Sequence, residues 1–130
     1  MKVTDERIKQ VKQAMKYTTG EPLHEHNDCV RIAYEWLDAQ NKTVSALKRA
    51  FALKHLIEQW GARYVSQSDV ELAAKLHPEI KGTYPYYNIS TKLTLPDEER
   101  LAGIGEAFAH PNYRDFQTAE TYTYKEKTNG

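Results

Sequence analysis

The densest group of side chains that could carry out chemistry lies between residues 24 and 29. His24, His26 and Cys29 offer nitrogen and sulfur atoms that zinc accepts as ligands, and Asp28 adds a carboxylate oxygen. A structural zinc site needs four ligands, and no second pair of cysteine or histidine residues lies nearby in the sequence. We therefore expect no metal ion and no other cofactor; if a metal were bound, His24, His26 and Cys29 would be its candidate ligands.

Cys29 is also a candidate nucleophile. We expect it near the N-terminus of a helix, where the helix dipole lowers the pKa of a thiol, with two histidines close by in the sequence. The histidines further along, His77 and His110, each precede a proline and do not fit the strand on which a base partner would lie. An inert core cysteine fits better. We therefore expect a non-enzymatic protein, and a metal- or thiol-dependent enzyme is the third of three hypotheses.

Basic and hydroxyl-bearing side chains gather between residues 48 and 92. Asparagine can form two hydrogen bonds with adenine, while lysines and hydroxyl groups bind phosphates. The leading hypothesis is a DNA-binding or nucleic-acid-associated regulator. Its contact surface would consist of Lys48, Arg49, Lys54, Tyr84, Tyr86, Tyr87, Asn88, Thr91 and Lys92.

The same tyrosines support an alternative function. Lysine plus arginine and aspartate plus glutamate both number 18, so the formal net charge is zero, which counts against non-specific coating of DNA. Tyrosine offers apolar area with a polar tip and is enriched in protein interfaces. The alternative is therefore a protein–protein interaction or inhibitory module that acts through Tyr84, Tyr86 and Tyr87.

The spacing of apolar residues predicts the helices that must position these groups. They are expected over residues 5–16, 27–40, 43–60, 66–76 and 96–109. Thr4, Asn27 and Thr43 are expected to cap the first three, and Ser66 with Asp69 forms the pattern of a capping box for the fourth. The third helix carries the widest apolar stripe and is expected to be central, with Gly61 just past its end.

Residues 84–95 fit two patterns. Their apolar residues suit one face of a helix and also the alternation of a strand, and β-branched and aromatic residues favour the strand. The helix and turn before them favour a short recognition helix, which we prefer by a small margin. The predicted fold class is mainly α: a small helical bundle of five to six helices with a helix-turn-helix-like centre, or with a short β-ribbon if residues 84–95 are extended.

Length and composition set the remaining expectations. The 130 residues suit one domain, expected over residues 1–116, and residues 117–130 form a polar tail that we expect to be flexible rather than to add an edge strand near residues 121–124. The single cysteine suits a reducing compartment, and no apolar run reaches the length of a membrane span. We therefore expect a cytoplasmic protein without membrane contact, and find no heptad pattern that would specify an oligomeric state.

Overall fold

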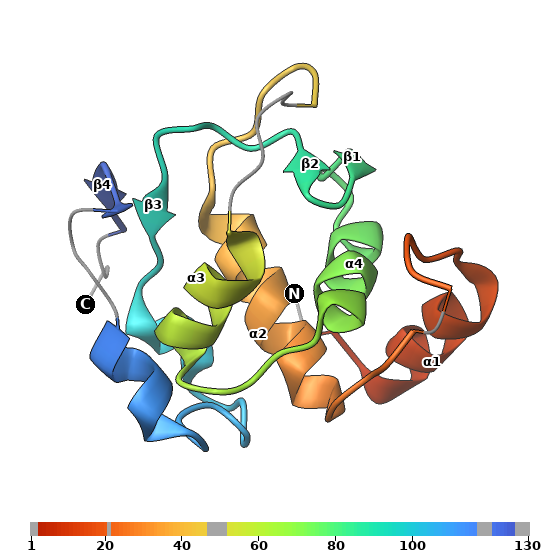
Figure 1. Cartoon of the computed structure of the whole chain (residues 1–130), viewed down its shortest axis with the longest axis horizontal. Coiled ribbons are helices and arrows are strands. Elements are labelled where there is room, and N and C mark those ends of the chain that lie inside the picture. The colour runs from red at the N-terminus through yellow and green to blue at the C-terminus, as the bar shows by residue number, and fades with distance from the viewer. Residues whose placement is uncertain (1–2, 21, 47–51, 117–120, 127–130) are drawn as a thin grey trace.

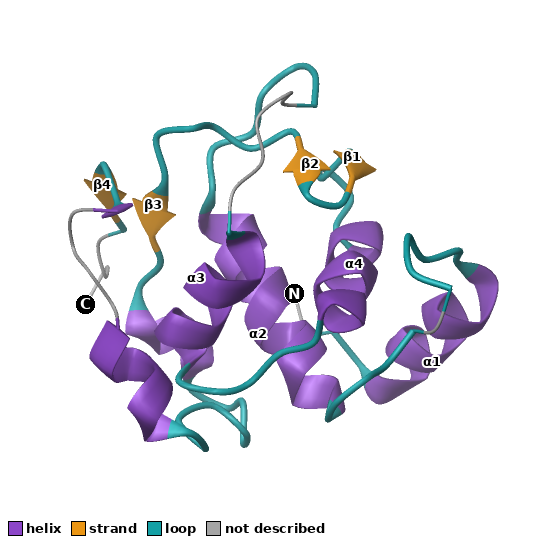
Figure 2. Ribbon diagram, viewed as in Figure 1, coloured by secondary structure: helices purple, strands orange, loops and turns teal. Residues whose placement is uncertain are grey.

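The computed structural model describes residues 3–20, 22–46, 52–116 and 121–126. These residues form mainly helices, with two small pairs of strands (Figures 1 and 2). The elements in chain order are α1 (Asp5–Ala14), α2 (Asn27–Ala39), α3 (Leu53–Gly61), α4 (Gln67–Leu76), β1 (Gly82–Thr83), β2 (Tyr86–Tyr87), β3 (Thr94–Leu95), the 3₁₀ helices η1 (Glu98–Leu101) and η2 (Pro111–Phe116), and β4 (Tyr124–Lys125).

The prediction of a mainly helical fold is confirmed, but the expected count of five to six helices is not matched. The described residues contain four α-helices. The helix expected over residues 96–109 is only the short 3₁₀ helix η1, because Gly103 and Phe108 adopt positive φ angles of 90° and 66° that an α-helix does not contain. None of the described helices is both long enough and apolar enough to cross a membrane.

Helix α2, and not the expected third helix, is the centre of the fold. It packs against α1, α3 and α4, and Figure 1 shows it between α3 and α4. Seven of its side chains are buried, including those of Ile32, Trp36 and Leu37. Its N-cap is His26 and not Asn27, because the His26 side chain accepts the hydrogen bond from the Asp28 N–H.

Helix α3 begins at Leu53, so the expected start at Thr43 is wrong. The Thr43 N–H donates to the carbonyl of Asn88 at 2.8 Å, which holds this residue in a β-like pairing with the distant segment. Residues 47–51, which the expected helix also included, lie outside the described residues. At the other end Gly61 is the last helical residue, and Ala62 takes the left-handed conformation with φ of 51°.

The caps of α1 and α4 are confirmed. Thr4 accepts a hydrogen bond from the Arg7 N–H, and Ser66 and Asp69 form the reciprocal bonds of a capping box. Helix α4 ends at Leu76, and the residue after it, His77, precedes a proline and lies in the extended region. These ends depend on neighbours within a few residues, so local patterns suffice to predict them.

Residues 84–95 do not form the recognition helix that we preferred. They contain β2 and β3, with a cis peptide bond between Tyr84 and Pro85 in the hairpin turn. Strand β1 pairs antiparallel with β2, so that Gly82 lies opposite Tyr87. The backbone beyond β2 pairs with residues 41–43: Ser90 N–H donates to the carbonyl of Asn41 at 2.8 Å. This long-range pairing outweighs the local helical pattern, and the helix-turn-helix lacks its second helix.

Residues 121–126 pack onto the domain. Strand β4 pairs in parallel with β3, with Thr94 opposite Tyr124. The hydroxyl of Tyr122 accepts a hydrogen bond from the indole of the buried Trp36 at 3.1 Å. This segment of the expected tail therefore reaches the central helix directly.

Candidate functional site

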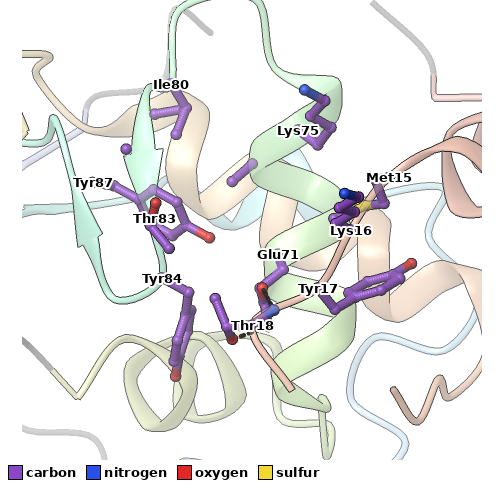
Figure 3. Close-up of a pocket in the computed structure, with 12 residues that line it drawn as sticks. Met15, Lys16, Tyr17, Thr18, Glu71, Lys75, Ile80, Thr83, Tyr84 and Tyr87 are labelled. Carbon is purple, nitrogen blue, oxygen red and sulfur yellow. Dashed lines mark hydrogen bonds between the residues drawn. The ribbon is translucent and has the colours of Figure 1, made fainter. Parts of the chain in front are cut away.

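A pocket of about 440 Å³ lies between the end of α1, the helix α4 and the β1–β2 hairpin (Figure 3). We call it the tyrosine pocket. Its lining residues are Met15, Lys16, Tyr17, Thr18, Glu71, Ala74, Lys75, Ile80, Gly82, Thr83, Tyr84 and Tyr87.

Two sets of hydrogen bonds fix the walls of this pocket. On one side, the backbone N–H and the hydroxyl of Thr18 both donate to the Glu71 carboxylate at 2.9 Å, which ties the segment after α1 to α4. On the other side, the buried Asn88 side chain accepts from the Lys81 N–H at 2.6 Å and donates to the carbonyls of Thr43 and Glu79. Asn88 thereby holds both ends of the hairpin.

Glu71 is a buried carboxylate with only 6% of its surface exposed. Besides the two bonds from Thr18 it accepts one from the Gln67 side chain at 3.2 Å. A carboxylate offers about four acceptor positions, so about one remains for a ligand in the tyrosine pocket.

Tyr84 and Tyr87 form the wall opposite Glu71 and Thr18 in Figure 3. Their rings meet edge to face, with centroids 6.2 Å apart. Burial raises the pKa of both phenols, and the Glu71 charge raises it further, so both hydroxyls keep their protons at neutral pH. Neither hydroxyl has a hydrogen-bond partner among the described residues, so both are free to bond a ligand.

Lys16 and Lys75 supply positive charge to the pocket. Both side chains are exposed, and neither forms an ion pair with a carboxylate in the described part of the chain. With Glu71 the lining therefore carries two ammonium groups and one carboxylate, and the ammonium groups can bind an anion.

A chain of hydrogen bonds runs behind Tyr17 at the edge of the pocket. His24 bonds Asp69 through Nδ1 and the Tyr17 hydroxyl through Nε2, both at 2.8 Å. Asp69 is fully buried and also accepts from the Glu25 N–H at 3.1 Å. Burial, with the charge of Asp69, raises the pKa of Tyr17 to about 12. Both ring nitrogens of His24 are thus occupied, and this chain clamps the loop before α2 onto α4.

The structure gives His24, His26 and Cys29 separate partners. His26 caps α2, while Cys29 is fully buried with its thiol 3.4 Å from the carbonyl of Tyr64. Burial raises the pKa of Cys29 to about 12, the opposite of the lowering that its place near a helix N-terminus predicts. Within the described ranges no group of three or more His, Cys, Asp or Glu side chains is arranged to hold a metal ion.

The residues predicted to contact DNA are divided among three environments. Tyr84 and Tyr87 line the tyrosine pocket, and Asn88 is committed to the three backbone bonds given above. Tyr86, Thr91 and Lys92 are exposed, with Tyr86 at 44%.

The basic residues expected on the helix over residues 43–60 are only partly described. Lys54 bonds Glu58 at 3.0 Å and lies 4.5 Å from the ring centre of Tyr64, so its charge is engaged within the domain. Lys48 and Arg49 lie outside the described residues.

Sequence reasoning did not identify Glu71 of α4, or Lys16 and Thr18 of the segment after α1, as groups of one pocket. Glu71 is the one with a local signal, because it is a charged residue among the apolar side chains of the packing face of α4, next to Val70. Lys16 and Thr18 carry no such signal, since only the packing of α1 on α4 brings them to the hairpin.

Comparison of the chain with protein-family models, with curated proteins and with solved structures found no match.

Proposed function

We propose that this protein binds single-stranded nucleic acid without catalysing a reaction, and that the tyrosine pocket receives one nucleotide. The observation that carries the proposal is the set of unpaired groups on the pocket lining: the ammonium groups of Lys16 and Lys75 and the free hydroxyls of Tyr84 and Tyr87.

These groups match the parts of a nucleotide. The ammonium groups can neutralise a phosphate, and the partly exposed ring of Tyr84 offers apolar surface against which a base can stack. Stacking on an aromatic ring contributes about 1–3 kcal/mol for each base.

A single strand fits this site better than a duplex. The predicted recognition helix is not formed, and residues 84–95 present no helix to a major groove. The tyrosine pocket lies between α4 and the hairpin, and only a base that is not paired can leave its strand and enter such a recess. The same physics would bind single-stranded DNA or RNA, since phosphates and bases are common to both.

The zero net charge sets an expectation for how this binding depends on salt. A protein without a general excess of positive charge gains little from long-range attraction to nucleic acid. If Lys16 and Lys75 contact two phosphates, the logarithm of the association constant falls with the logarithm of salt concentration with a slope of about −1.4.

The second candidate function is binding of a protein partner through Tyr86. This tyrosine is 44% exposed on β2, and both residues of β1 are exposed beside it. Exposed tyrosines are enriched in protein interfaces, and the neutral charge of the chain suits a protein partner.

The test is a titration of the protein against a fluorescently labelled single strand of about ten mixed nucleotides, a length within the range of single-strand binding sites. The duplex of the same sequence is titrated in parallel, at about 50 mM and about 200 mM salt. We expect the single strand to bind more tightly than the duplex, with the shallow salt dependence given above. The variant Lys16→Ala/Lys75→Ala should bind at least tenfold more weakly.

The matched control is Lys9→Ala/Lys125→Ala, which removes two exposed lysines that do not line the pocket. Equal loss in both double variants, or no binding of the single strand at low salt, would overturn the proposal. In the second case, capture of a protein partner that is lost in Tyr86→Ala would favour the second candidate.

A further inference from the structure

Glu71 differs from every other polar side chain of the tyrosine pocket in the kind of hydrogen bond that it can form with a ligand. Lys16 and Lys75 can only donate hydrogen bonds, whereas the hydroxyls of threonine and tyrosine can donate or accept. An ionised carboxylate can only accept. Glu71 is therefore the lining side chain that requires a donor from the ligand.

The Glu71 carboxylate has about one acceptor position left for a ligand, and its other hydrogen bonds fix its orientation. Thr18 occupies both of its oxygens and Gln67 occupies one of them a second time. Glu71 is 6% exposed, so only a small part of its surface faces the pocket. A ligand that places an acceptor there would meet the negative charge without compensation.

The nucleic-acid bases differ in whether they can donate a hydrogen bond to this carboxylate. Adenine and cytosine carry an exocyclic amino group, and guanine carries both an amino group and the adjacent N1–H, so each can donate to the carboxylate. Thymine and uracil have no amino group, and their single N3–H lies between two carbonyl oxygens that would face the negative charge.

We infer that Glu71 is a specificity-determining residue, and that the tyrosine pocket favours nucleotides whose base carries an exocyclic amino group over thymine and uracil. This inference rests on the proposed function. One hydrogen bond to a charged group that is made by one base and not by another corresponds to a preference on the order of tenfold in affinity.

The experiment compares oligo(5-methyl-dC) with oligo(dT) of equal length. These two strands have the same backbone and the same methyl group at C5, and they differ in the amino or carbonyl group at C4 and in the proton at N3. Stacking area and phosphate charge are therefore matched. We expect the folded wild-type protein to bind the cytosine strand about tenfold more tightly.

The variant Glu71→Gln should reduce this preference to less than about threefold, because a glutamine amide can turn to accept or to donate. The control Glu79→Gln changes an exposed carboxylate outside the pocket and should keep the full preference. If Glu71→Gln does not fold, equal binding of the two strands by the wild type still overturns the inference.

The possible outcomes distinguish a failure of the role of Glu71 from a failure of the proposed nucleotide binding. Equal binding of the two strands, or a preference for thymine, overturns the role of Glu71 and leaves nucleotide binding in place. A preference that persists in folded Glu71→Gln likewise overturns that role. Failure of both strands to bind overturns the proposed function itself.

Discussion

The guanidinium of Arg100 holds the carboxylate of Glu126 through two hydrogen bonds, each of 2.7 Å. The same guanidinium bonds two carboxylates of α2, Glu35 at 2.7 Å and Asp38 at 2.9 Å. Arg100 therefore connects the residues after β4 to the central helix. Because three acidic side chains share one cation, the pKa of Arg100 is raised, most of all by its hydrogen bonds with Glu126.

Replacement of this cation should destabilise the fold. Arg100→Gln leaves three carboxylates facing one another, and the cluster is only partly screened because the Arg100 side chain is 22% exposed. We expect the free energy of unfolding, measured by urea denaturation, to fall by about 1–2 kcal/mol. Lys125→Gln removes an exposed lysine that has no ion pair among the described residues, and should change stability by less than about 0.5 kcal/mol. Equal stability of the two variants would contradict the arrangement.

The same ion pair predicts how stability depends on pH. The hydrogen bond with Arg100 lowers the pKa of Glu126 below its ordinary value of 4.5. A lowered folded-state pKa contributes stability above the ordinary value, and this contribution is lost as the pH falls through the folded-state pKa. Wild type should therefore be more stable than Glu126→Gln at pH 7, and urea denaturation should show the difference shrinking below about pH 4.5. A difference independent of pH would argue against the ion pair.

Asn88 should matter for stability more than the exposed residues near it. Its buried side chain makes three hydrogen bonds with backbone groups of Lys81, Thr43 and Glu79. Asn88→Ala leaves these groups unpaired and should lower the melting temperature, with a cost of about 2–4 kcal/mol. Lys92→Ala, which changes an exposed side chain four residues along the chain, should melt within about a degree of wild type. Similar melting of both variants would indicate that Asn88 faces solvent.

Cys29 should be unreactive in the folded protein. It is fully buried, and burial raises the pKa of its thiol to about 12, so almost none is ionised at pH 8. We expect iodoacetamide, followed by mass spectrometry, to modify Cys29 slowly in buffer and rapidly in urea. Rapid modification of the folded protein would instead support a thiol-dependent enzyme.

Sequence patterns predict the parts of this fold that depend on near neighbours. The caps at Thr4 and Ser66 are examples. Local patterns do not explain Gly61. A Cβ at this position would lie 2.5 Å from the Cγ2 of Ile32, so the glycine is needed where α3 approaches α2. A glycine near a helix end suggested a C-terminal cap, but the cause is a contact with another helix.

The candidate site was predictable only in part. The tyrosine-rich run predicts a contact surface that includes Tyr84 and Tyr87, and both residues line the pocket. The pairing of Thr43 with Asn88 holds the same run in an extended form, and no local pattern contains that pairing. Glu71 lies on α4 and Lys16 in the segment after α1, so their part in the pocket depends on tertiary packing.

The pairing of β3 with β4 has a consequence for synthesis on the ribosome. Thr94 leaves the ribosome well before its partner Tyr124, whereas α1 to α4 lie entirely within the first 76 residues. Domains begin to assemble while synthesis continues. The helices α1 to α4 can thus begin to pack before residues 121–126 have left the ribosome. During that interval the edge of β3 that later pairs with β4 has no partner strand.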